Sequence, residues 1–110
     1  MALTEKQLAQ SRPGTTAATQ VYSPPASTTG VVVFMTIANT SASPALARVF
    51  HDDDGTTYDE STALIWDLSI AANTTVYEKV YWPIDESGNL AVATSVASAL
   101  TFTFGGVEVT

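Results

Sequence analysis

The acidic run from Asp52 to Glu60 is the stretch whose residue types and spacing most suggest chemistry. It reads Asp-Asp-Asp-Gly-Thr-Thr-Tyr-Asp-Glu, and oxygen-rich loops of this kind can bind calcium. An EF-hand is excluded, because its first ligand position would fall on Phe50 and its flanking helices are missing from the pattern. We therefore interpret the run as a hairpin tip with carboxylates in solvent, in which Asp54-Gly55 supplies positive φ angles. A bound cation is the alternative.

Acid–base chemistry is the second possibility that we considered. His51 is the only histidine, and it adjoins three aspartates. No cysteine and no Gly-x-Ser-x-Gly motif is present to supply a nucleophile. The carboxylates at 59–60 and 85–86 can form a glycosidase pair only if they converge, whereas adjacent strand residues point to opposite faces. We expect no enzymatic activity and no cofactor.

Sugar binding by stacked aromatic side chains is the third possibility that we considered. The candidates are Tyr22, Tyr58, Trp66, Tyr77, Tyr81 and Trp82. We expect Trp66 in the core, because it alternates with Leu64, Leu68 and Ile70 on one apolar strand face. Trp82 precedes Pro83 at a strand end and is expected to be exposed, so a carbohydrate-binding module stays open.

The elements that must position these residues are strands. Segments of strand character occur at 21–22, 31–37, 46–52, 64–70, 74–82, 90–96 and 100–104. Turn signals separate them every 8–15 residues, a spacing typical of sandwiches and jelly rolls. We predict an all-β protein with a single antiparallel β-sandwich or jelly-roll-like domain of about seven strands over residues 31–110. Gly105-Gly106 is expected to mark a bulge or bend in the last strand.

Residues 1–30 are expected to form an N-terminal arm, helical or extended, followed by a linker. Thr4 and Gln7 have the spacing of a capping box, and Leu3 and Leu8 that of a hydrophobic staple. Arg12-Pro13-Gly14 would end a helix over residues 3–11. A helix of about two turns is marginal by itself, so the arm either folds back on its own domain or docks on another subunit.

Composition narrows the classes of partner. The 110 residues carry a net charge of −7, with four basic residues and 14% charged residues in all. Residues 1–12 sum to +1 and residues 13–110 to −8. The excess of acidic residues disfavours nucleic acid as a ligand, and no apolar run is long enough to span a bilayer. The charge-poor surface favours contacts with other proteins.

Several segments resemble small structural virion proteins of tailed bacteriophages. They are Leu8–Pro13, Ala18–Pro25, Ala38–Thr40, Arg48–Phe50, Asp52–Asp59, Ala63–Leu64, Ser69–Thr75, Ser87–Val92 and Ser98–Thr103. The resemblance implies a capsid decoration or cement protein, a homotrimer bound to the major capsid protein or other virion proteins. It would reside in the virion after assembly in the host cytoplasm. A neck, baseplate or tail-fibre component is the alternative. The segments contain no catalytic motif, so no functional residue is carried over.

The interface residues that we predict lie in two places. Leu3, Leu8 and Arg12 are the candidates in the arm. Val32 and Phe34 are the candidates on the strand at 31–37, which is apolar on both faces, and we expect both to face outward.

Overall fold

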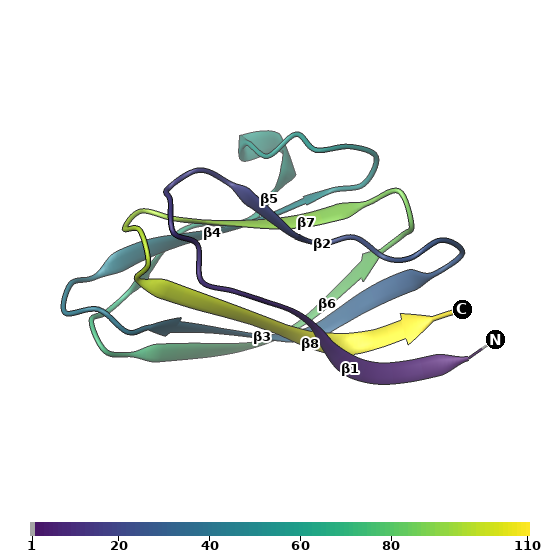
Figure 1. The fold of residues 1–110 in the computed structure, drawn as a ribbon, viewed down its shortest axis with the longest axis horizontal. Helices are drawn as coiled ribbons and strands as arrows, with labels where there is room; N and C mark the ends of the chain where they lie inside the picture. Colours follow the sequence, from purple (N-terminus) through teal and green to yellow (C-terminus); the bar gives the residue numbers. More distant parts are fainter. Residues whose placement is uncertain (1) are drawn as a thin grey trace.

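The computed structural model describes residues 2–110 and contains two β-sheets packed face to face (Figure 1). The strands are β1 (Leu3–Ser11), β2 (Thr19–Tyr22), β3 (Thr29–Asn39), β4 (Ala45–Asp52), β5 (Ala63–Ile70), β6 (Thr75–Ile84), β7 (Asn89–Thr94) and β8 (Leu100–Val109), with a 3-10 turn, η1 (Glu60–Thr62), before β5. Sheet A has the order β1-β8-β3-β6 and sheet B the order β2-β7-β4-β5. All pairings are antiparallel. The predicted all-β sandwich is confirmed.

The helix expected over residues 3–11 is wrong. These residues form β1, which pairs with β8 from Leu3 opposite Val109 to Ser11 opposite Phe102. A two-turn helix satisfies few of its backbone groups internally, whereas a strand here forms a ladder along an edge of β8 that would otherwise stay unpaired. Residues 1–30 thus contribute an edge strand to each sheet, β1 to sheet A and β2 to sheet B. The chain ends lie side by side (Figure 1).

The main core lies between the sheets. Its largest fully buried side chains are Val32, Met35, Ile37, Val49, Ile70, Ile84, Leu90, Val92, Leu100, Phe102 and Phe104. A smaller cluster of Phe50, Ala91 and Ala93, with Tyr58 and Ala63 packed against it, is separate from this core.

A bulge in β3 decides which of its side chains face outward. The register of β3 shifts between Val32 and Phe34 against both neighbouring strands. Val32 and Met35 are fully buried, while Val33 is 38% exposed. The expectation that Val32 faces outward is therefore wrong, because the extra residue of a bulge reverses the alternation. Gly105 and Gly106, which were expected to mark a bulge or bend in the last strand, lie opposite this bulge in the neighbouring β3. The ring of Phe34 occupies the place of a Cβ on Gly105.

A second irregularity divides β5. Asp67 has a left-handed φ of 56°, and the pairing with β4 shifts register beside it. Leu68 and Ile70 therefore face the core, whereas Leu64 and Trp66 are 38% and 41% exposed. The prediction of one buried face that includes Trp66 is wrong for this reason.

A polar link joins the two sheets near the chain ends. Tyr22 of β2 donates a hydrogen bond of 2.6 Å from its hydroxyl to Oε2 of Glu108 on β8. Lys6 Nζ lies 3.2 Å from Oε1 of the same carboxylate. Burial of Tyr22, followed by its bond to Glu108, raises the pKa of the phenol. The hydrogen bond from Tyr22, followed by the pairing with Lys6, holds the pKa of Glu108 below its usual value. Gly30 leaves room for the tyrosine ring, which lies where a Cβ would stand.

Candidate protein–protein interface

The two sheets do not close against each other along β5 and β6, which we call the open edge. A groove of about 540 Å³ runs between these edge strands. Its apolar lining comes from Ile65, Trp66 and Leu68 on β5 and from Val80 and Trp82 on β6; all except the exposed Trp66 are half-buried against the core. Glu78 also lines the groove. Unpaired edge strands beside half-buried apolar side chains form a surface that another polypeptide can cover.

The outer face of sheet A continues this surface around β6. Tyr77 and Tyr81 are 56% and 72% exposed. They stand two residues apart, so both side chains point away from the core. The ring of Tyr77 stacks on that of Phe34, with centroids 6.2 Å apart and planes inclined by 26°. Large exposed aromatic side chains that share one face of a sheet are typical of sites for protein or ligand contact.

The outer face of sheet B carries a charged and aromatic cluster. Arg48 donates to both carboxylate oxygens of Asp67, with Nε 2.6 Å from Oδ1 and Nη2 3.2 Å from Oδ2. Its guanidinium also lies 3.6 Å from the ring centroid of Trp66. This hydrogen bonding holds the pKa of Asp67 below, and that of Arg48 above, its ordinary value. The cluster covers one face of Trp66 and braces the bulge in β5.

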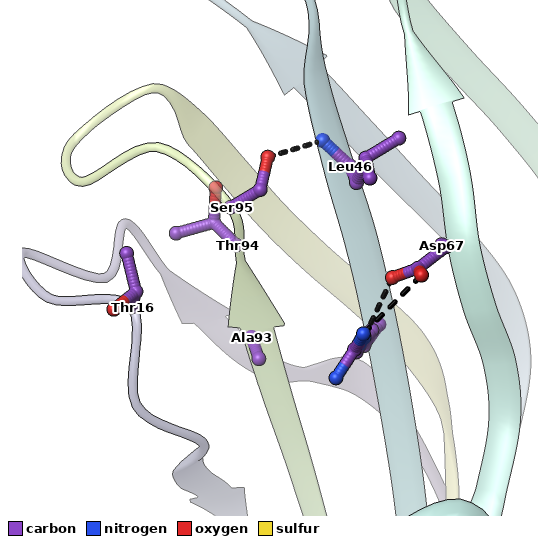
Figure 2. Close-up of a pocket in the computed structure, with 7 residues that line it drawn as sticks. Thr16, Leu46, Asp67, Ala93, Thr94 and Ser95 are labelled. Carbon is purple, nitrogen blue, oxygen red and sulfur yellow. Dashed lines mark hydrogen bonds and ion pairs between the residues drawn. The ribbon is translucent and has the colours of Figure 1, made fainter.

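Beside this cluster lies a pocket of about 220 Å³ (Figure 2). It is lined by Thr16, Leu46, Arg48, Asp67, Ala93, Thr94 and Ser95. Ser95 accepts a hydrogen bond from the backbone N–H of Leu46 at 2.8 Å, and Arg48 and Asp67 satisfy each other. Much of the polar capacity of this pocket is therefore used within the fold.

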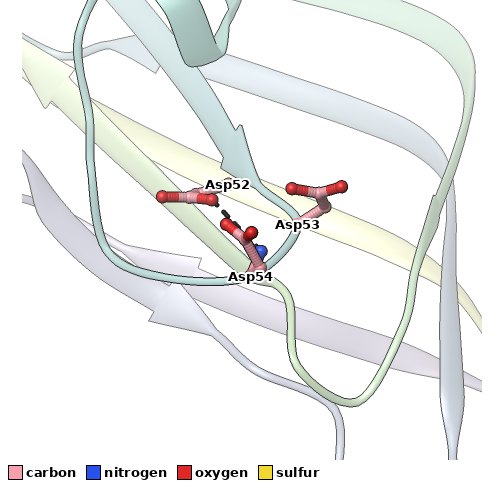
Figure 3. Close-up of side chains that lie close together, drawn as sticks. All are labelled: Asp52, Asp53 and Asp54. Atoms are coloured by element: carbon pink, nitrogen blue, oxygen red, sulfur yellow. Dashed lines mark hydrogen bonds between the residues drawn. The ribbon is translucent and has the colours of Figure 1, made fainter.

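The three adjacent aspartates form the tip of the β4 hairpin (Figure 3). Their carboxylate oxygens lie within 4.8 Å of one another. Asp52 is only 7% exposed, and it accepts backbone hydrogen bonds from Asp54 at 3.1 Å and Thr57 at 2.8 Å. These bonds hold the pKa of Asp52 below its usual value, while the interaction with Asp52 raises that of Asp54. We therefore ascribe the cluster to the structure of the loop.

Two details of this hairpin differ from expectation. Asp52 is buried rather than in solvent, because its oxygens organise the loop backbone. No glycine among residues 2–110 has a positive φ, and Asp54 does not have one either. The prediction that Asp54-Gly55 supplies the positive φ angles of this turn is therefore wrong. The side chain of His51 lies against Gly88. Its buried Nε2 has no hydrogen-bond partner and lies 3.2 Å from the position that a Cβ on Gly88 would occupy.

The predicted interface residues are dispersed over the fold. Leu3 on β1 is 65% exposed and Arg12 is exposed, as an interface requires. Leu8 is half-buried against the core, and Val32 is fully inside it. Phe34 is half-buried on the outer face, under Tyr77. The alternation pattern of β6 contained the signal for Tyr77 and Tyr81, since both faces of that segment carry aromatic or β-branched residues.

No protein-family model matches the sequence. No curated protein matches it either. Among solved structures, the chain is similar to one in the structure of infectious bursal disease virus, Gt strain, with 12% sequence identity and a TM-score of 0.46. The similarity covers 97% of this chain and 30% of the viral chain. A likeness of this size carries no conclusion about this chain. In the part of the chain that the structure describes, no helix is long and apolar enough to cross a membrane.

Proposed function

We propose that this protein is a structural virion component of a tailed phage, used as a homotrimeric decoration or cement protein on the capsid shell. The observation that carries the proposal is the open edge, where the sandwich leaves an apolar groove and two exposed tyrosines, Tyr77 and Tyr81, without a covering element. The major capsid protein, or another virion protein, would be the partner.

Three further features support a contact role. Only 14% of the residues are charged, so most of the surface has little charge to desolvate on binding. The net charge of −7 disfavours nucleic acid as the ligand. The resemblance of several segments to phage virion proteins supports the setting.

The mechanism would be the burial of modest apolar areas at many equivalent contacts. At about 25 cal/mol per Å², a few hundred Å² per copy offsets only part of the entropy lost on docking. An oligomer that places several copies on one shell site converts weak single contacts into avid binding.

The stoichiometry of the chain in purified particles tests this proposal. Quantitative mass spectrometry should find on the order of hundreds of copies for a shell decoration that repeats with the capsid lattice. A dozen or fewer copies would instead support the alternative, a neck, baseplate or tail-fibre component. Absence of the chain from particles would overturn both.

A carbohydrate-binding module is the second candidate, favoured by the exposed rings of Tyr77 and Tyr81 on one face of β6. From the sequence we expected an exposed Trp82 as a sugar-binding ring, but its side chain is half-buried against the core. A polysaccharide pull-down with Tyr81→Ala, and with Tyr58→Ala in the loop between β4 and η1 as the control, separates the two candidates. Binding that only the first variant loses would favour glycan recognition.

A further inference from the structure

The two edge strands of sheet A are free on opposite sides of the sheet. β1 pairs only with β8, and β6 only with β3. Because sheet A has four antiparallel strands, β1 and β6 run in opposite directions. Suppose that two copies are related by a rotation about an axis parallel to the strands. Every strand then keeps its direction, so β1 of one copy can lie beside β6 of the next copy and run antiparallel to it. The topology of sheet A therefore allows head-to-tail growth into a closed ring.

We propose that copies of this chain join head to tail by antiparallel pairing of residues 3–7 with residues 77–81 of the next copy. The inference rests on the homo-oligomer of the proposed function and identifies its contact. In this register Glu5 stands opposite Lys79 of the next copy. Lys6 stands opposite Glu78 of that copy. Both pairs join opposite charges, which directly facing positions on paired strands favour.

The side chains on the two strands have matching faces. Leu3, Glu5 and Gln7 share the outer face of β1, since Lys6 points inward to Glu108. Tyr77, Lys79 and Tyr81 share the outer face of β6, since Val80 and Trp82 pack on the core. Residues that face each other across an antiparallel pair project to the same side, so the outer residues of β1 must oppose the outer residues of β6.

Only one register in this range satisfies the charges. A shift by one residue would place outer side chains opposite inner ones. A shift by two residues in one direction would place Glu5 opposite Tyr81, and in the other direction opposite Tyr77. In either case the opposite charges of the two strands no longer meet. The proposed register also sets Leu3 against Tyr81, the two most exposed large apolar side chains of the described residues.

The inner side of this contact adjoins the groove of the open edge. Lys6 is 47% exposed although it contacts Glu108, so its ammonium can also reach Glu78 of the next copy, which lines the groove. Thr4 would lie opposite Val80, another groove residue. Lys79 and Arg12 make no ion pair within residues 2–110 of one copy. The pairing supplies a partner for Lys79.

The register implies a tilted ring. Along the rows of sheet A, Gln7 is level with Gly105, Phe34 and Lys79. Pairing Lys79 with Glu5 instead shifts the next copy by two residues, about 7 Å over the roughly 19 Å width of four strands. This corresponds to a strand tilt of about 20°. We place the outer face of sheet A toward the axis, because Leu3, Tyr77 and Tyr81 are then shielded from water.

Disulfide trapping tests the contact, because the chain has no cysteine of its own. The variant Gln7→Cys/Tyr77→Cys should form covalent oligomers on mild oxidation. Within one copy these positions lie on opposite edges of sheet A, three strand spacings or about 14 Å apart, so an intramolecular disulfide is excluded. In the control Gln7→Cys/Tyr81→Cys the second thiol is displaced by about 13 Å along the strand, and cross-linking should fall at least about tenfold.

Charge exchange is the second arm of the test. Lys79→Glu should weaken self-association, measured by sedimentation velocity, by about fivefold per contact, because an ion pair becomes a repulsive pair. Adding Glu5→Lys to that variant should restore it. Asp53→Lys makes the same change of net charge at an exposed loop position and should not restore it.

The outcomes separate this inference from the virion role. Selective trapping together with restoration by charge exchange supports the strand pairing. Equal cross-linking in both cysteine pairs, or a monomer at all concentrations, overturns it. Rings that form in solution but are absent from particles would refute the virion role and leave the pairing intact, whereas particles that carry monomers would do the opposite.

Discussion

Removal of one hydroxyl group, in Tyr22→Phe, should measurably loosen the link between the two sheets. Tyr22 is 8% exposed, and its hydroxyl lies 2.6 Å from Oε2 of Glu108, whose side chain is 12% exposed. A hydrogen bond to a charged group contributes about 1.5–3 kcal/mol. Because Glu108 keeps its contact with Lys6 and some access to water, we expect a loss near the lower bound, about 1.5 kcal/mol. For a domain of this size that corresponds to a melting temperature lower by roughly 6–10 °C.

Urea unfolding of Tyr22→Phe, Glu108→Gln and the double variant gives the coupling free energy directly. Tyr81→Phe, which removes a hydroxyl that is exposed to solvent, is the matched control and should change stability by less than about 0.5 kcal/mol. A Tyr22→Phe variant as stable as this control, or additive effects in the double variant, would show that the bond does not hold the sheets together.

The same link makes a prediction about pH. The pKa of Glu108 lies below its ordinary value of 4.5, so the folded state binds this proton less readily than the unfolded chain does. The stabilisation is therefore present above about pH 4.5 and is lost as the pH falls through the lower pKa of the folded state. Tyr22→Phe should lose less stability than the wild type between pH 5 and pH 3. An equal loss in both proteins would contradict this assignment.

Four further substitutions test the placements described above. Gly30→Ala should destabilise the domain by about 1–3 kcal/mol, measured by urea unfolding, because its Cβ would overlap the ring of Tyr22. Val32→Ala should cost about 2 kcal/mol and Val33→Ala less than about 0.5 kcal/mol if the bulge directs only the first into the core; equal values would be inconsistent with the bulge. Asp52→Asn should accelerate hydrogen exchange of the two loop amides that bond its oxygens, and unchanged exchange would mean that the carboxylate does not organise the loop.

The sandwich could be predicted from the sequence because alternation and turn residues are local signals. Every segment of expected strand character overlaps a strand, although the one at 90–96 ends two residues earlier than expected. β1 was missed because a short capping pattern at Thr4 and Gln7 is also local, whereas the advantage of a strand depends on β8, about a hundred residues later. Local pattern therefore identified most strands but could not identify a pairing between the two ends of the chain.

The candidate site was predicted less well, and bulges are the physical reason. One extra residue at Val33–Phe34, and one left-handed residue at Asp67, each reverse the alternation for the rest of the strand. Val32 thereby moved into the core and Trp66 out of it. Only the Gly105-Gly106 pair marked such a position in advance, because a strand with two glycines lacks the side chains that would exclude Phe34.

The features that block strand pairing at the sheet edges indicate which edges can pair with another copy. β5 is interrupted by the bulge at Asp67, which Arg48 fixes, so a regular ladder cannot extend along it. The side chains of β6 alternate regularly between the two faces from Val76 to Trp82, although its pairing with β3 shifts register opposite Val33. Its one exposed cation, Lys79, would oppose pairing with any strand that lacks a facing acid. β1 provides that acid at Glu5, on the face where Lys79 stands. The charge that blocks random pairing of β6 is therefore the charge that selects β1 of another copy.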